Sequence, residues 1–230
     1  MCDMGKSGRG ALALGAVVKS VAGLAIMGLL LFLPAGGFDY RGAWLLLALL
    51  FIPMTILGVA MLILSPNVLR RRLKAKEERS KQSFVVRLSG LMFIVGFVVA
   101  GLDHRYGWSE VSLSVVVVAS AIFLMAYAMY VEVIRENEWL SRTVEVSEGQ
   151  QVVSTGLYGV VRHPMYLATL FLFLSMPIIL GSWWAVIPFL CYIPIIVLRT
   201  IDEERLLVAQ LDGYADYCRR VRWRIIPYVW

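Results

Sequence analysis

Long apolar segments alternate with short polar ones along this 230-residue chain. A helix needs about 20 apolar residues to cross a bilayer. We therefore expect an all-α integral membrane protein with about six transmembrane helices. The expected spans are residues 12–33, 43–64, 88–102, 111–134, 164–180 and 184–198.

The last two spans are joined by residues 181–183 alone, which predicts a tight C-terminal helical hairpin. The sixth span is short and contains Pro188 and Pro194, and proline interrupts helical hydrogen bonding. Two polar segments, 135–162 and 199–230, flank the hairpin and must therefore end near each other. We expect both to be cytoplasmic.

Basic residues set the expected orientation. Of the 22 lysines and arginines, only Arg41 and Arg105 fall on one side of a six-span protein, and twenty fall on the other if Lys19 is counted. Basic loops stay in the cytoplasm, so both termini and both polar segments are expected there, in a multi-pass protein of the cell (inner) membrane. Many of the arginines and lysines between residues 70 and 87 are read as a topology signal that also contacts anionic lipids.

Two regions are expected on this basis. Residues 1–87 form an N-terminal region of two spans and a basic loop, and residues 88–230 form a core of four spans with the two polar segments. The basic loop is not read as a nucleic-acid site, because a topology signal already accounts for it.

Composition agrees with a membrane protein. The chain is 60% hydrophobic and 17% charged, whereas soluble domains have about 45–50% apolar and about 25% charged residues. Its three cysteines are far apart and form no CxxC pair. With only His104 and His163 available, we expect no metal site. The G-x-G-x-x-G fingerprint of nucleotide-binding Rossmann folds is absent as well.

Residues 155–166, TGLYGVVRHPMY, are the first candidate for chemistry. Pro164 suits the first turn of a helix. Arg162 and His163 would then lie at the helix N-terminus, beside its free N–H groups and the positive end of its dipole. Because an apolar run follows, this helix end is expected at the membrane surface. The sequence predicts a polar, anion-receptive pocket there.

The second candidate begins at the end of the sixth span. Arg199 and Glu203 are four residues apart and share a helix face. Alone, this pattern is typical of a salt-bridged interfacial helix. We expect the helix to run to about Leu211 and to end at Asp212-Gly213. In the first polar segment, 143–146 and 150–153 are expected to be extended, with a turn at 147–149.

The combined pattern of TGLYGVVRHPMY, RTIDEERLL, DGYADY and R-x-I-P resembles the isoprenylcysteine carboxyl methyltransferase family and its phospholipid-methyltransferase relatives. The resemblance covers about residues 143–227. Members of this family are integral-membrane enzymes that transfer the methyl group of S-adenosylmethionine to a lipid-borne acceptor. The chain departs from the family pattern at Ala168, where glycine is common, and in the linker 211–214.

The resemblance implies that the two cytoplasmic segments help to bind the cofactor and that Arg199 faces the acceptor. The cofactor-binding residues would be Gln150, Gln151, Val152, Val153, Tyr158, His163, Pro164, Met165, Tyr166 and Glu203, with Thr143 at the edge of the region.

These residue types suit the cofactor. A helix N-terminus with His or Arg can receive its carboxylate, Glu203 its amine or ribose, and a tyrosine its adenine or sulfonium. Methyl transfer then requires alignment and exclusion of water.

Three interpretations of the function remain open. A carboxylate acceptor needs orientation by Arg199 and no base. An amine acceptor, as in phospholipid methylation, would be repelled by Arg199 and would need a base such as Glu204. The third is a non-catalytic membrane binding module on the same fold. We expect carboxyl O-methylation of a lipophilic acceptor, with Arg199 and Glu204 as the candidate catalytic residues.

Overall fold

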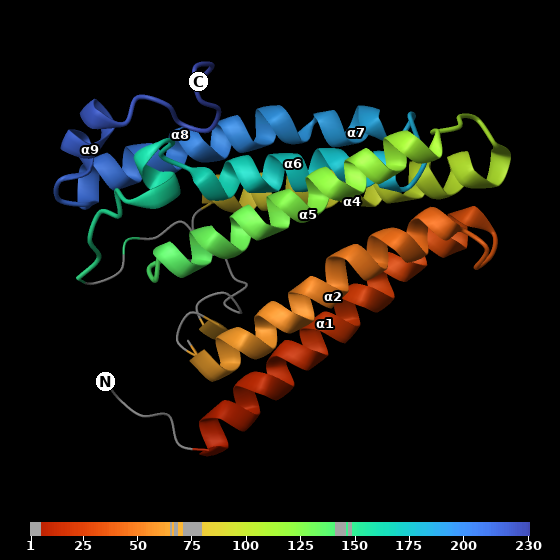
Figure 1. The fold of residues 1–230 in the computed structure, drawn as a ribbon, viewed down its shortest axis with the longest axis horizontal. Coiled ribbons are helices and arrows are strands. Elements are labelled where there is room, and N and C mark those ends of the chain that lie inside the picture. Colours follow the sequence, from red (N-terminus) through yellow and green to blue (C-terminus); the bar gives the residue numbers. More distant parts are fainter. Residues whose placement is uncertain (1–5, 65, 67–68, 71–79, 141–145, 147–148) are drawn as a thin grey trace.

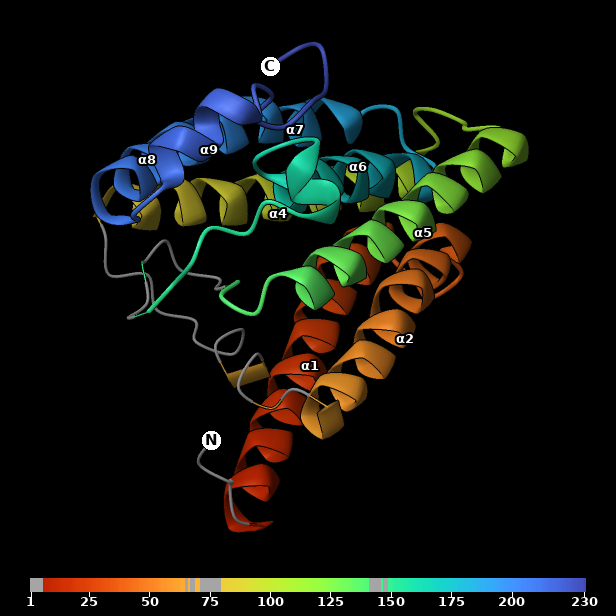
Figure 2. The ribbon, with the colours of Figure 1, turned by 60° about the vertical axis from the view of Figure 1, so that its left-hand side comes forward.

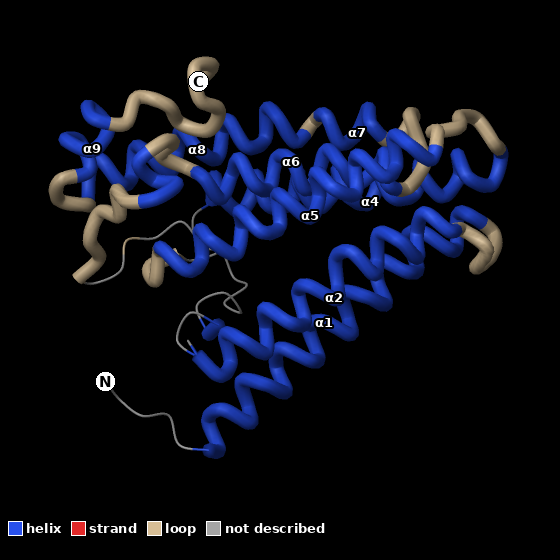
Figure 3. Tube along the Cα trace, viewed as in Figure 1, coloured by secondary structure: helices blue, strands red, loops and turns tan. Residues whose placement is uncertain are grey.

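A computed structural model of the chain describes residues 6–64, 66, 69–70, 80–140, 146 and 149–230. All regular secondary structure in these residues is helical (Figure 3). The elements are α1 Lys6–Ala35, α2 Arg41–Leu64, α4 Ser80–Tyr106, α5 Leu113–Glu136, the 3-10 helix η1 Gly156–Gly159, α6 Pro164–Ile179, α7 Val186–Leu190, α8 Tyr192–Gln210 and α9 Tyr214–Arg220.

Four described helices, α1, α2, α4 and α5, are long and apolar enough to cross a membrane. The fifth expected span, α6, has 16 residues. The sixth is divided at Cys191 into α7 and α8, and Pro194 lies in the first turn of α8. The all-α architecture agrees with an integral membrane protein, and the number of six spans stays a prediction.

Two local expectations change. Helix α4 begins at Ser80, well before the apolar run that starts at Leu88, because backbone hydrogen bonds continue through polar residues. The expected boundary at residue 87 therefore lies inside a helix. No strand forms at residues 150–153, and residues 143–145 and 147–148 lie outside the described part of the chain.

Helices α4, α5, α6 and α8 form one bundle, with α7 at one end (Figure 1). The α1–α2 hairpin lies against this bundle near the end that contains α7. Towards the opposite end of the bundle, the hairpin diverges from it (Figures 1 and 2). Gly101 allows α4 to approach α1 closely, since a Cβ there would lie 2.7 Å from the carbonyl oxygen of Leu31.

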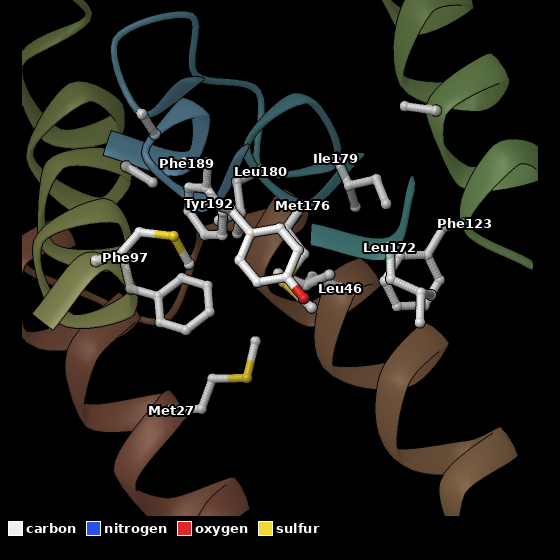
Figure 4. Close-up of a cluster of buried hydrophobic side chains, with 14 of the residues drawn as sticks. Met27, Leu46, Phe97, Phe123, Leu172, Met176, Ile179, Leu180, Phe189 and Tyr192 are labelled. Carbon is white, nitrogen blue, oxygen red and sulfur yellow. The ribbon is translucent and has the colours of Figure 1, made fainter. Parts of the chain in front are cut away.

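A continuous apolar core connects the hairpin to the bundle. Phe189 of α7 is fully buried and lies between Phe93 and Phe97 of α4, with ring centroids 5.7 Å apart in both pairs. Leu46 of α2 and Leu172 of α6 belong to the same cluster (Figure 4). Because this core includes side chains of α1, α2, α4, α5 and α6, it fixes their order around the bundle.

Buried polar contacts hold the connections at the end of the bundle that contains α7. Asp103 is 1% exposed and accepts hydrogen bonds from the Ser109 backbone N (2.8 Å), the Ser109 Oγ (2.6 Å) and the Ser182 Oγ. The Tyr40 hydroxyl donates to the carbonyl of Leu180 at 2.7 Å. Three connections therefore meet at one end, and the polar segments of residues 149–163 and 211–230 lie at the other (Figure 1).

Replacing Asp103 should destabilise this closed end. Asp103→Ala leaves the buried hydroxyl of Ser182 and the partly buried hydroxyl of Ser109 without their acceptor, which should lower the free energy of unfolding by about 3 kcal/mol. Thermal unfolding in detergent measures the loss. Asp39→Ala, at an 88% exposed side chain of the same end, is the control and should change stability by less than about 0.5 kcal/mol. Equal melting temperatures for the two variants would contradict the role assigned to Asp103.

Candidate active site

A pocket opens at the end of the bundle opposite Asp103. Its enclosed part holds about 90 Å³, and the space between its walls, including the open mouth, is about 830 Å³. The lining comes from the end of α5, the segment before α6, the first turn of α6, and α8 and α9. These residues are Asn137, Trp139, Leu140, Gln150, Gln151, Val152, Val153, Tyr158, Arg162, His163, Met165, Tyr166, Arg199, Glu203, Leu206, Leu207, Leu211, Tyr214 and Tyr217.

The first turn of α6 forms the floor of the site as the sequence predicts. Pro164 is the first helical residue, and the preceding His163 is the N-cap with φ −126° and ψ 65°, because a residue before proline is kept out of the helical region. The backbone N–H groups of Arg162 and His163 donate to the carbonyls of Trp223 (2.9 Å) and Arg224 (2.8 Å). The C-terminal segment thus fixes the entry into α6.

Glu204 of α8 is the centre of an ion-pair cluster. Its Oε1 lies 2.9 Å from Nε of Arg162 and 3.2 Å from Nε2 of His163, and its Oε2 accepts a hydrogen bond from Nε of Arg224 at 2.8 Å. The Glu204 side chain is only 10% exposed, and it does not line the pocket. One carboxylate therefore joins α8, the start of α6 and the C-terminal segment.

Two opposing effects act on the pKa of Glu204. Burial alone would raise it, but hydrogen bonds from His163 and Arg224 and the charges of His163 and Arg162 outweigh burial and hold the pKa below its ordinary value of 4.5. The carboxylate is therefore ionised at neutral pH.

Tyr166 connects Arg199 and Glu203 on the pocket wall. Its hydroxyl donates to Oε2 of Glu203 and accepts a hydrogen bond from Nε of Arg199 at 3.0 Å. The ring of His163 stacks on that of Tyr166 with centroids 5.4 Å apart. The predicted shared face of Arg199 and Glu203 is confirmed, and the tyrosine of α6 closes it into one polar wall.

A second wall is built around Tyr158 of η1. Its hydroxyl accepts a hydrogen bond from Nδ2 of Asn137 (2.9 Å), and its carbonyl accepts one from the Tyr217 hydroxyl (2.7 Å). The carboxylate of Glu136 accepts the N–H of Leu157 at 3.1 Å. Side chains from α5 and α9 thus hold η1 in place.

Most of the predicted site residues lie together in this pocket, including Arg199. Pro164 starts α6 without lining the pocket, Glu204 lies behind it, and Thr143 is outside the described residues. The predicted cofactor-binding residues that line it are Gln150, Gln151, Val152, Val153, Tyr158, His163, Met165, Tyr166 and Glu203.

Sequence reasoning missed several lining residues. The sequence pattern assigns no binding role to Asn137, which immediately follows α5, or to the tyrosine pair Tyr214 and Tyr217. A small amide at the end of a span and a Gly-Tyr-x-x-Tyr sequence after a helix were the available signals. The apolar lining of α8, Leu206 and Leu207, follows helical periodicity and carries no signal of its own.

The comparisons with known proteins cover the same region. A family model described as phospholipid methyltransferase matches residues 109–211. That stretch contains every lining residue except Tyr214 and Tyr217. The match supports a resemblance to membrane methyltransferases, and it does not distinguish the isoprenylcysteine type.

Curated relatives carry a different name. Delta(14)-sterol reductase TM7SF2 of Mus musculus is 35% identical over 91 residues, which cover 38% of this chain and 22% of that protein. Delta(14)-sterol reductase of Arabidopsis thaliana is 26% identical over 133 residues, which cover 53% of this chain and 36% of that protein. The chain therefore spans between about a fifth and about a third of the length of these relatives.

Removing the Glu204 charge should destabilise the protein in a pH-dependent manner. Glu204→Gln leaves the buried guanidinium of Arg162 without its counter-charge and should lower the free energy of unfolding by about 3 kcal/mol at pH 7. Because folding lowers the pKa of Glu204, its stabilisation is complete above pH 4.5 and is lost as the pH falls through the folded pKa. The difference in melting temperature between wild type and variant should therefore become smaller as the pH is lowered from 7 to 3.5.

Asp216→Asn is the control for this comparison. Asp216 pairs with Arg219 on the surface, where both side chains are more than half exposed, so this variant should melt close to the wild-type temperature at each pH. A Glu204→Gln variant that melts like wild type at pH 7 would refute the ion-pair cluster.

Proposed function

We propose that this chain is a membrane methyltransferase that uses S-adenosylmethionine and acts on a lipophilic acceptor, specifically a carboxylate. The observation that carries the proposal is the coincidence of three features in one pocket. The family match, the motif resemblance and the polar wall of Arg199, Tyr166 and Glu203 all converge there.

The lining fits the parts of this cofactor. His163 and Arg162 at the start of α6 would receive its carboxylate, and Glu203 its amine or ribose hydroxyls. Val152 and Leu207 offer an apolar surface for adenine, beside the ring of Tyr158. When bound, the cofactor supplies a methyl group on a positively charged sulfur.

Arg199 supports a carboxylate acceptor. A guanidinium can hold one carboxylate oxygen and leave the other directed at the methyl carbon. When the cofactor is bound, it would supply the methyl carbon to that oxygen, and its carbon–sulfur bond would break to leave S-adenosylhomocysteine. The neighbouring Leu198 is about half exposed on the apolar outer surface of α8, so a lipid-anchored acid would meet Arg199 at the edge of the bilayer.

Amine methylation is the alternative within this reaction class, and the name of the matching family model favours it. A protonated amine must lose a proton before it attacks. Glu204 is buried, ionised and engaged by three cationic or imidazole groups, which favours a positioning role over that of a base. In an amine methyltransferase of this geometry Glu203, which lines the pocket, would be the better candidate base.

The curated relatives favour a second candidate function, the reduction of a carbon–carbon double bond in a sterol-like lipid. Such a reaction adds a hydride and a proton, so the pocket would have to accept a nicotinamide cofactor as the hydride donor. The Tyr166 hydroxyl would be the candidate proton donor.

Product formation distinguishes these functions. Purified protein is supplied with methyl-labelled S-adenosylmethionine and, in separate reactions, small prenylated thiol acids or phosphatidylethanolamine vesicles. A parallel reaction contains NADPH and a sterol diene. The proposal predicts a base-labile labelled ester from the acids. Labelled amine or reduced sterol would establish the respective alternative, and cofactor binding without any product would favour a non-catalytic module.

Arg199→Lys should separate acceptor orientation from cofactor binding. Lysine keeps the charge but lacks the planar pair of donors, so turnover of the acid should fall roughly a hundredfold while cofactor affinity stays close to wild type. Arg205→Lys, at an exposed position of the same helix, is the matched control and should retain full turnover. A tolerated Arg199→Lys together with an inactive Glu203→Gln would indicate an amine acceptor.

A further inference from the structure

Tyr214 presents a buried hydroxyl that no described residue satisfies. It is the first residue of α9, is 4% exposed and lines the pocket. Among the described residues its hydroxyl has no hydrogen-bond partner. Most buried polar side-chain atoms are hydrogen-bonded, and an exception needs a physical reason.

The neighbouring tyrosine shows that the local fold can satisfy such a group. Tyr217, one turn further along α9, donates its hydroxyl to the carbonyl of Tyr158 at 2.7 Å. Both rings pack in the same apolar cluster with Leu211 and Val221. Tyr217 therefore connects α9 to η1 by a hydrogen bond, whereas the hydroxyl of Tyr214 has no such partner among the described residues.

The turn before α9 brings Tyr214 to the pocket. Gly213 has φ +80°, a conformation that glycine adopts readily and other residues rarely. It allows the chain to reverse after α8, so that Tyr214 joins the apolar cluster against which Leu207 of α8 and Val152 pack. This linker is also where the sequence departs from the methyltransferase pattern.

Arg162 adds a second buried donor to the same pocket. Its side chain is 9% exposed, and its Nε lies 2.9 Å from Oε1 of Glu204. The N–H direction does not meet that oxygen, so Nε has no hydrogen-bond acceptor in the described part of the chain. Two buried donors, a hydroxyl and a guanidinium N–H, thus lack acceptors in one pocket.

The ion-pair cluster that contains Arg162 has an excess of basic groups. Arg162 and Arg224 bring two positive charges to the single negative charge of Glu204, which leaves the cluster with one net positive charge. The N-terminus of α6 adds the positive end of its helix dipole. Burial and the nearby Glu204 raise the pKa of Tyr214, so its hydroxyl remains protonated and acts as a donor.

We propose that the Tyr214 hydroxyl, together with Arg162, binds a carboxylate oxygen of the ligand in this pocket. The inference rests on the proposed function, in which both the cofactor and the acid acceptor carry a carboxylate. Arg199 lies on the wall with Tyr166 and faces the acceptor, whereas Arg162 adjoins His163 at the start of α6. We therefore assign the methionyl carboxylate of the cofactor to Tyr214 and Arg162.

Calorimetry with two nucleosides tests the assignment. S-adenosylhomocysteine carries the carboxylate, and 5′-methylthioadenosine lacks the whole amino-acid part. Tyr214→Phe should weaken binding of S-adenosylhomocysteine about ten- to hundredfold and leave binding of methylthioadenosine unchanged. The ligand-free variant should melt at the wild-type temperature or above it, because an unsatisfied buried hydroxyl is removed.

Tyr217→Phe is the matched control. The same atom is removed one turn away, but here a satisfied hydrogen bond is lost. This variant should melt at a lower temperature than wild type, whereas Tyr214→Phe should not. The two tyrosines should therefore show opposite changes in stability.

The remaining outcomes are decisive as well. If Tyr214→Phe leaves the affinities for both nucleosides unchanged but raises the KM for the acid acceptor about tenfold or more, Tyr214 and Arg162 bind a carboxylate as proposed, but that of the acceptor. Unchanged affinities together with an unchanged KM would overturn it, as would equal losses for both nucleosides. Failure of the wild-type protein to bind either nucleoside would instead refute the proposed function itself.

Discussion

One buried carboxylate determines how the pocket is assembled. Glu204 of α8 interacts with Arg162 and His163 before α6 and with Arg224 of the C-terminal segment. Removing an ionised carboxylate from water costs several kcal/mol, and only well-placed opposite charges and hydrogen bonds offset it. The desolvation free energy of Glu204 is offset only when all three segments are in position. The ion-pair cluster thus fixes α6 against α8, and with it the meeting of Tyr166, Arg199 and Glu203.

Each end of the bundle contains a buried carboxylate that accepts hydrogen bonds from several segments, but the surroundings of the two carboxylates differ. At the closed end, Asp103 accepts hydrogen bonds from serine donors of two connections, and among the described residues no buried side-chain donor there lacks an acceptor. At the pocket end, Glu204 is satisfied as well, but the donors of Tyr214 and Arg162 remain without acceptors in the described structure. A fully satisfied cluster is typical of a structural contact, whereas surplus buried donors are typical of a binding site.

Much of this arrangement follows from the sequence by simple rules. Hydropathy alone predicts α1, α2, α4 and α5, and Pro164 marks the start of α6. The short hairpin between the last two apolar runs implies that the two polar segments meet. Helical spacing places Arg199 and Glu203 on one face, and the resemblance adds the residues of 150–166 to the same site.

Other features depend on tertiary contacts that spacing does not encode. Glu203 and Glu204 are adjacent and identical in type, yet one faces the pocket and the other the ion-pair cluster, because helical neighbours point about 100° apart. Which of the two meets Arg162 depends on the rotation of α8. The division into α7 and α8 at Cys191, and the pairing of residues 223–224 with the start of α6, likewise arise from packing between distant segments.

The central claim is that this pocket binds the methyl-donating cofactor. A cryo-electron microscopy structure with S-adenosylhomocysteine would test it most directly. We expect ligand density between residues 150–153, Tyr158 and His163, with the ligand carboxylate within hydrogen-bonding distance of Tyr214 or Arg162. Density for the nucleoside at another position, or a pocket that stays empty at saturating ligand and fills with NADPH instead, would contradict it.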